Sequence, residues 1–196
     1  MRASFSAMNF CSPVVPDPPT FALLFPPLSV PALTHIVRCL VAGGTCVFSR
    51  DLAFLRQAGV DFVSGSPNHF AALIRDRAPG GSRIPVALAG GGPIRKALAE
   101  GLLAHFHHVM IRYSSTEVGN ICQRVISDVA GQDEMISPGP AQPPARLQIV
   151  DDTGAVLPAL REGTVRTQTP ALVRGYLGKP AESAQVFRDG WFYPGD

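Results

Sequence analysis

Apolar residues between positions 31 and 115 recur at two alternating spacings, one typical of amphipathic helices and one typical of buried strands. After Pro31 they follow helical spacing until Gly43-Gly44 supply a stop, and Pro67 opens another helix in the first-turn position that suits proline. The expected helices cover 32–42, 51–58, 67–77 and 94–106, and the expected strands cover 45–49, 60–65, 86–90 and 109–115. This order predicts an α/β fold over residues 31–125, a parallel sheet with helices on both faces.

The two ends of the chain have a different character. Seven of the 19 prolines lie between Pro13 and Pro31, so residues 1–30 are expected to be an irregular, Pro-rich segment. Beyond a soft boundary at 125–140, residues 146–158 are typical of a β-hairpin, 163–169 of a strand, and 188–196 of a further hairpin turn. Residues 126–196 are therefore expected to form a β-rich, barrel-like segment.

Composition narrows the class of protein. The chain has 196 residues, 46% hydrophobic and 16% charged, which fits one ordinary domain and argues against disorder. A net charge of +2 provides no basic patch for nucleic acid. No run of 18 apolar residues and no signal peptide are present, so no transmembrane segment is expected. The four cysteines lack CxxC spacing, which favours buried thiols in a reducing cytoplasm over a zinc site or a disulfide framework.

A glycine-rich turn follows the strand expected at 86–90. In AGGGPIRK, Gly90, Gly91 and Gly92 lack Cβ atoms, so a flat ligand or a phosphate could approach the backbone closely. The alternative is a tight strand-to-helix turn that needs glycine only for its geometry. The motif is neither a Walker P-loop nor a GxGxxG fingerprint.

The sequence RYSSTEVG ends the next expected strand. Tyr113 offers a ring face for stacking, and Ser114, Ser115 and Thr116 offer hydroxyl donors for an anion. Glu117 offers a carboxylate oxygen, which Mg²⁺ prefers alongside phosphate oxygens and water. The alternative is a helix that begins here with Thr116 as its N-cap.

The sequence DGWFYPGD ends at Asp196, whose carboxylate could accept two ribose hydroxyls. The alternative is an ordinary turn aspartate. Taken together, AGGGPI, YSSTE and the long stretch EGTVRTQTPALVRGYLGKPAESAQVFRDGWFYPGD resemble, in order and spacing, motifs of the adenylate-forming (AMP-binding) superfamily, which includes acyl-CoA synthetases. Ser114 stands where that family usually has glycine, and Pro194 where it usually has threonine.

This resemblance implies a role for each matching residue. The implied assignments are Gly91, Gly92 and Pro93 against the adenine, Tyr113 stacked on the base, Ser114 and Ser115 beside the nucleotide, Thr116 at the α-phosphate, Glu117 at Mg²⁺, Asp196 at the ribose, and His69 or Phe70 at the acyl substrate. Thr116 and Glu117 are the residues expected to take part in catalysis. A packing role is the alternative for His69 and Phe70.

The resemblance also implies parts that these residues do not match. The family's Ser/Thr/Gly-rich phosphate loop has no counterpart in residues 1–24, and its catalytic lysine follows the Gly-Asp that here is Gly195-Asp196. Neither Lys96 nor Lys179 occupies that position. Because adenylation needs positioned donors around a highly charged α-phosphate, a fragment without the C-terminal lysine domain is expected to be inactive alone.

The implied activity is ATP-dependent ligation of a small carboxylic acid to a thiol. An acyl-adenylate and pyrophosphate form first, with ATP and Mg²⁺, and the acyl group then passes to a thiol such as coenzyme A. A carrier-loading adenylation domain of the peptide-synthetase type stays open, and so does a non-catalytic nucleotide-binding or interaction module. The His105-Phe106-His107-His108 run lacks a cysteine or carboxylate at ligand spacing, and its imidazoles are expected to face either solvent or the helix dipole at a helix end.

Overall fold

The computed structural model describes residues 19–196, which divide into two compact units. Unit 1 holds the chain up to Ile111 together with Val125–Ser137, and unit 2 holds Arg112–Arg124 together with Pro138–Asp196. The sequence pattern predicted a soft boundary at 125–140. In the structure the chain enters unit 2 within one strand, returns to unit 1 within the next, and enters unit 2 again at Pro138.

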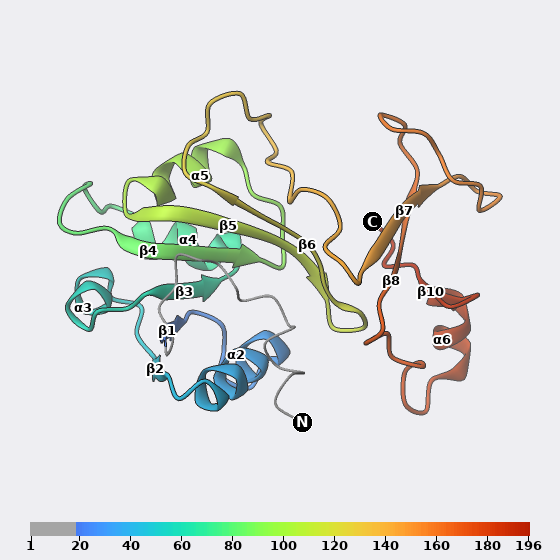
Figure 1. Ribbon diagram of the computed structural model, residues 1–196, viewed down its shortest axis with the longest axis horizontal. Coiled ribbons are helices and arrows are strands. Elements are labelled where there is room, and N and C mark those ends of the chain that lie inside the picture. The colour runs from blue at the N-terminus through green and yellow to red at the C-terminus, as the bar shows by residue number, and fades with distance from the viewer. Residues whose placement is uncertain (1–18) are drawn as a thin grey trace. The chain divides into compact units, whose positions relative to one another are not determined.

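Unit 1 is built on a largely parallel sheet (Figure 1). The strands and helices of this sheet are β1 (Thr20–Leu23), α2 (Val30–Val41), β2 (Thr45–Val47), α3 (Leu52–Gln57), β3 (Phe62–Gly65), α4 (Pro67–Ile74), β4 (Ile84–Gly90), α5 (Lys96–Leu103), β5 (Phe106–Ser115) and β6 (Gly119–Ile126). The end of β5, from Arg112, and most of β6, up to Arg124, belong to unit 2. Within residues 19–196 the strand order is β2-β1-β3-β4-β5-β6, and β1 pairs in parallel with both β2 and β3, as β3 does with β4. The predicted α/β class is confirmed.

Alternating side chains along the strands supply a core on each face of this sheet. In β3, Phe62 points into a cluster that includes Ala32 and Cys39 of α2, while Val63 points into a cluster with α3, α4 and α5. Successive strand residues face opposite sides, so strands rich in apolar residues bury both faces at once. Helices therefore cover both faces, as the sequence pattern predicted.

Capping residues place the helix starts. Ser29, Asp51 and Ser66 each accept a backbone N–H of the first turn, and Pro67 occupies the first position of α4. The helix expected over 94–106 is shorter than predicted. It begins at Lys96 because the preceding residue, Arg95, forms a β-bridge with Met135.

Two strands were not predicted. β1 lies within the segment 1–30 that was expected to be irregular, and it runs between β2 and β3 with Phe21, Ala22 and Leu23 all buried. The prediction is wrong there because the prolines flank this strand, so no ladder N–H is lost from it. The rest of the predicted irregular segment, residues 1–18, lies outside the described residues. β6 follows a three-residue turn where a helix capped by Thr116 was the alternative, so that alternative is also wrong.

Unit 2 contains an antiparallel sheet of order β7-β8-β10-β9 and one helix. Its elements are β7 (Arg146–Val150), β8 (Thr164–Gln168), α6 (Pro180–Val186), β9 (Phe187–Arg188) and β10 (Trp191–Phe192). The predicted final hairpin is confirmed: Asp189 and Gly190 join β9 to β10 with positive φ values of 52° and 76°, the conformation of a tight hairpin turn. The sheet is open with β7 and β9 at its edges, where a barrel-like form was expected, because strands this short and few do not close.

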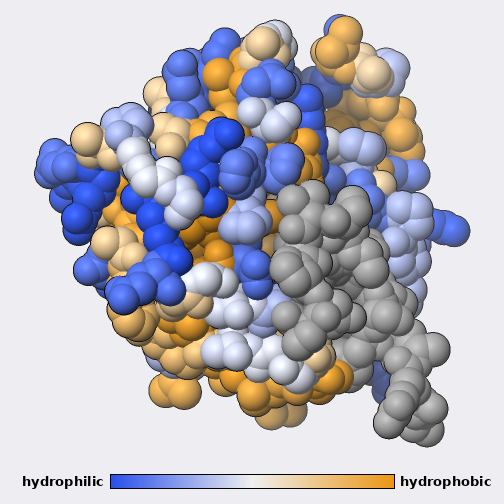
Figure 2. Space-filling view, turned by 60° about the vertical axis from the view of Figure 1, so that its left-hand side comes forward, coloured by the Kyte–Doolittle hydropathy of each residue, from blue (hydrophilic) through white to orange (hydrophobic). Residues whose placement is uncertain are grey.

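Apolar side chains also reach the surface. On α2, Leu33, Val37 and Leu40 are 46%, 48% and 64% exposed, and Figure 2 shows apolar residues among polar ones on one face of the molecule. No helix within residues 19–196 has both the length and the apolar character needed to cross a membrane.

Candidate functional site

Unit 2 brings together two site residues that are far apart in the sequence. The Tyr113 hydroxyl donates a hydrogen bond to Oδ2 of Asp196 over 2.5 Å, across a sequence separation of 83 residues. Tyr113 is half-buried beside the cluster of Val118, Cys122 and Phe192. Burial, and after it the hydrogen bond to Asp196, raise the pKa of Tyr113 above its usual range. The tyrosine is therefore a neutral hydrogen-bond donor at physiological pH.

The turn between β5 and β6 carries the other predicted polar residues of unit 2. Ser114 and Ser115 end β5 and are half-buried, while Thr116 and Glu117 lie in the turn itself, with Thr116 exposed. The Ser115 hydroxyl oxygen is buried and finds no hydrogen-bond partner within residues 19–196. A buried polar atom of this kind is costly unless a partner is supplied, and a ligand is one source of such a partner.

Glu117 has a partner that the sequence pattern did not indicate. The Tyr176 hydroxyl donates to Oε1 of Glu117 over 2.8 Å, and the backbone N–H of Val173 donates to the Glu117 carbonyl over 3.0 Å. The loop between β8 and α6 thus holds this residue at both its side chain and its backbone. The sequence signal at Tyr176 was weak, because a tyrosine in a Gly-rich loop has no local pattern to distinguish it.

The glycine-rich turn belongs to unit 1. Gly90 ends β4, and the next residues, Gly91, Gly92 and Pro93, are exposed. Gly91 has a φ of +77°, which other residues rarely adopt, while a Cβ atom there would meet nothing within 4 Å. Gly91 is therefore required by its backbone conformation, and the space beside it is open.

A small cavity lies near the carboxyl ends of β1, β2 and β3 in unit 1. It has a volume of about 120 Å³ and is lined by Leu24, Arg50, His69, Ala72 and Leu73. Ligands of open α/β sheets bind outside the carboxyl ends of the strands, so this is the expected edge of the sheet.

His69 has a defined protonation state in this cavity. The backbone N–H of Ser66 donates to His69 Nδ1 over 3.2 Å, so the neutral ring carries its proton on Nε2. Burial, and after it the nearby Arg50 guanidinium, lower the pKa of His69. The Phe25 ring meets the imidazole edge-on at 5.3 Å. Near neutral pH, His69 therefore presents one N–H donor, in a cavity that also contains a cationic side chain.

Phe70, predicted with His69 as a substrate contact, lies in the core. Its side chain is fully buried and meets the Phe106 ring edge-on at 5.9 Å. His69 and Phe70 are neighbours on α4, and consecutive helical residues point in different directions. The structure thus leaves His69 at the cavity and places Phe70 in the packing between α4 and β5.

Other polar residues have structural positions. Of the two orientations expected for the histidines, exposure to solvent is wrong for His105, which is buried with its Nδ1 3.1 Å from Arg56 Nη2. Its run of histidines spans the end of α5 and the start of β5, whose packing turns His105 inward. Cys39 and Cys122 are buried free thiols as predicted, Cys46 is a free thiol that is only half-buried, and Cys11 lies outside the described residues. Within residues 19–196 no three His, Cys, Asp or Glu side chains gather into a metal cluster.

The fold is that of an α/β protein, with candidate polar groups in both units. The family model described as AMP-binding enzyme matches residues 3–177, so the chain belongs to this family.

Individual relatives agree with this assignment. The chain is 36% identical over 110 residues to the fatty acid–[acyl-carrier-protein] ligase ScoC of Streptomyces coeruleorubidus, covering 55% of this chain and 21% of the relative. It is 28% identical over 169 residues to a feruloyl-CoA synthase of Amycolatopsis sp, covering 80% of this chain and 34% of the relative. The fold matches unliganded O-succinylbenzoate coenzyme A synthetase (MenE) of Bacillus subtilis with a TM-score of 0.81 and 21% identity, covering 98% of this chain and 41% of that one. The chain thus spans well under half the length of each of these proteins.

Proposed function

We propose that this chain carries nucleotide-binding and acid-binding elements of an AMP-forming acid–thiol ligase. In that reaction a carboxylate oxygen of the acid attacks the α-phosphorus of ATP, the bond to the bridging oxygen breaks, and pyrophosphate leaves with its electron pair. The resulting acyl-adenylate then transfers its acyl group to a thiol, releasing AMP. Membership of the AMP-binding enzyme family supports this reaction class.

The observation that carries the proposal is the Tyr113–Asp196 hydrogen bond in unit 2. An aromatic ring provides a stacking surface for a base, and a carboxylate accepts hydrogen bonds from vicinal hydroxyls. To bind one nucleoside, the stacking ring and the carboxylate must lie no farther apart than the base and the ribose hydroxyls do. These are the two residues to which the resemblance assigns adenine and ribose, and the fold brings their side chains into direct contact.

The phosphate side of the site is proposed at the β5–β6 turn. The Thr116 and Ser115 hydroxyls would donate to phosphate oxygens, and the Glu117 carboxylate would hold Mg²⁺. Mg²⁺ is commonly bound by one or two carboxylates together with substrate phosphates and water. Glu117 fits this mode, since within residues 19–196 it belongs to no cluster of metal-binding side chains. The ion would reduce the negative charge on the phosphates that the attacking carboxylate must approach.

The acid is proposed to reach the cavity beside His69. The Nε2–H of the neutral imidazole would donate to an acceptor on the acid, while Leu24 and Leu73 supply apolar walls. The volume of about 120 Å³ suits a small group. Phe70 is fully buried in the core and is not proposed to touch the substrate.

The acceptor thiol is proposed to be coenzyme A or a carrier-bound pantetheine. The names of the relatives support a thiol of either kind, since one is an acyl-carrier-protein ligase and the other a CoA synthase. The cytoplasm is proposed as the compartment for this reaction, because the cysteines lack the spacing of a disulfide framework or a zinc site.

Equilibrium binding of AMP and ATP, measured by isothermal titration calorimetry, tests the proposal. Asp196→Asn should weaken both nucleotides, because it replaces the acceptor of the ribose hydroxyls, and Tyr113→Leu should weaken them by removing the stacking ring. Asp189→Asn is the matched control, since it changes an aspartate of the same unit at a positive-φ turn that asparagine also tolerates. Absence of binding at millimolar nucleotide, in a chain shown to be folded by circular dichroism, would refute the proposal and favour an interaction module.

A further inference from the structure

The loop between β8 and α6 in unit 2 forms three hydrogen bonds with the turn that carries Glu117. Thr169 Oγ1 donates to the Val118 carbonyl over 2.8 Å, the Val173 N–H donates to the Glu117 carbonyl over 3.0 Å, and the Tyr176 hydroxyl donates to Glu117 Oε1 over 2.8 Å. The first two bonds fix the backbone of the turn. Only the third acts on the side chain, and it therefore determines where the carboxylate lies.

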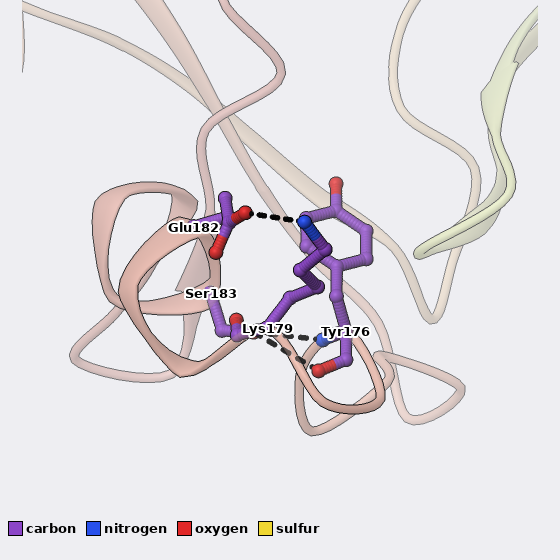
Figure 3. A network of polar contacts seen from close by, with 4 residues as sticks. All are labelled: Tyr176, Lys179, Glu182 and Ser183. Carbon is purple, nitrogen blue, oxygen red and sulfur yellow. Dashed lines mark hydrogen bonds and ion pairs between the residues drawn. The ribbon is translucent and has the colours of Figure 1, made fainter.

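Tyr176 is itself held by the start of α6. Its backbone N–H donates to Ser183 Oγ over 2.8 Å (Figure 3). The Ser183 hydroxyl donates in turn to the Lys179 carbonyl over 2.6 Å. Lys179 also forms an ion pair with Glu182 over 2.9 Å. The tyrosine ring meets Phe187 edge-on at 5.3 Å. The contacts with Ser183 and Phe187 thus fix the orientation of the Tyr176 ring independently of the hydrogen bond from its hydroxyl to Glu117.

The residue before Tyr176 makes this arrangement possible. Gly175 has a φ of +150°, and a Cβ atom built on it would lie 2.9 Å from Ser183 Oγ and 3.2 Å from Ser183 Cβ. A side chain there would push Ser183 away from the Tyr176 N–H. The order Gly175-Tyr176 therefore serves the close approach of Ser183, which in turn anchors the tyrosine.

Within the described residues, only one oxygen of the Glu117 carboxylate takes part in a side-chain hydrogen bond. Oε1 accepts the phenol, while Oε2 makes no side-chain hydrogen bond to the described part of the chain. Carboxylates that bind metal ions are themselves hydrogen-bonded as a rule, because such a bond fixes the direction of the ligating oxygen. A neutral phenol does this without adding a charge that would compete with the ion.

We propose that Tyr176 is a positioning residue for the Glu117 carboxylate and thereby sets the affinity for the divalent cation that accompanies the nucleotide. This inference rests on the proposed function, which assigns Mg²⁺ to Glu117. It is more specific than stabilisation of the loop, because the Tyr176 side chain is 38% exposed and its ring already packs on Phe187 without the hydroxyl.

The test measures how much a divalent cation improves ATP binding. Titration calorimetry gives the affinity of the chain for ATP without metal and for ATP with saturating Mn²⁺, and the ratio of the two is the metal-dependent gain. Tyr176→Phe keeps the ring and removes only the hydroxyl. It should lower this gain by roughly tenfold, the lower end of what loss of a ligand's hydrogen-bond partner costs. Affinity for metal-free ATP should not change.

Two further variants show whether Tyr176 acts through Glu117. Glu117→Gln should abolish most of the gain, and adding Tyr176→Phe to it should then have no further effect, since the two changes remove parts of one interaction. Tyr193→Phe is the matched control: its hydroxyl contacts Arg166 in the same unit, and its removal should leave the gain unchanged.

Each other outcome refutes a definite statement. A gain that is the same in wild type and Tyr176→Phe overturns the positioning role and leaves the proposed function intact. A loss of metal-free ATP binding in Tyr176→Phe shows a structural role instead, and it overturns the proposal as well. A folded wild-type chain that binds no ATP at all overturns both this inference and the proposed function.

Discussion

Truncation of Phe70 distinguishes a core residue from a substrate contact. The ring is fully buried and meets Phe106 edge-on at 5.9 Å. Phe70→Ala should therefore reduce the free energy of unfolding by about 3–5 kcal/mol, which combines lost burial with the cavity left behind. Within that cost, the aromatic pair should account for about 0.5–1.5 kcal/mol. Because small domains are stabilised by about 5–15 kcal/mol in total, Phe70→Ala should be visibly destabilised yet measurable.

The measurement must report on unit 1, whereas the single tryptophan, Trp191, lies in unit 2. Native-state hydrogen exchange of peptides from α4, β4 and β5 gives the opening free energy of the relevant elements. A double-mutant cycle of Phe70→Leu and Phe106→Leu isolates the ring pair while keeping the chain folded. Phe54→Ala is the control, since that ring is 50% exposed and should cost within about 0.5 kcal/mol. If Phe70→Ala cost no more than this control, the ring would not be in the core and its exclusion from the substrate site would fail.

Three other changes test local features. His69→Gln should make the stability of the chain less sensitive to acid. Because the pKa of His69 is lowered in the folded state, the unfolded chain binds more protons below about pH 6.5, and the free energy of unfolding decreases as the pH is lowered. Glutamine can still accept the capping hydrogen bond but does not titrate. Thermal melts between pH 5 and 8 would show a smaller slope that His105 still contributes to, and an unchanged slope would contradict the reasoning. Gly163→Ala should destabilise unit 2 by about 1–3 kcal/mol, because the new Cβ atom would lie 2.6 Å from the Val150 carbonyl oxygen. Denaturant unfolding followed by tryptophan fluorescence measures this loss. An unchanged free energy of unfolding would show that β7 shifts freely to make room. Asp51→Ala should cost about 1 kcal/mol by removing the N-cap of α3, measured as faster amide exchange there, whereas unchanged exchange would mean that the cap is dispensable.

The periodic part of the fold could be predicted because the forces that set it are local. Helical spacing, Pro67 at a first turn and a capping Asp51 all act within a few residues, and α3 and α4 begin where these signals place them. α5 begins later than its pattern because Arg95 takes part in a β-bridge with Met135. The bridge, which replaces the first helical residues, is formed with Met135, 40 positions later in the chain, so the helical pattern at 94–106 cannot predict it.

β1 shows why a short central strand escapes such a pattern. Thr20–Leu23 offers only four residues, and Pro19 and Pro26 on either side suggest an irregular segment. The strand exists because it gains neighbours on both edges, pairing with β2 and with β3. The strand is therefore stabilised by tertiary contacts, and the prolines indicate only where it begins and ends.

The residues of the candidate site also differ in whether a local sequence pattern or only the fold indicates them. Tyr113, Glu117 and Asp196 could be proposed from the sequence because their motifs keep a recognisable order. Tyr176 could not, since its partner Glu117 lies 59 positions earlier and a tyrosine hydroxyl has no periodicity. The local trace of its role is Gly175, whose absent Cβ admits Ser183. A glycine of this kind indicates that something must approach the backbone closely, but only the fold shows that the approaching serine serves to orient a tyrosine toward a carboxylate.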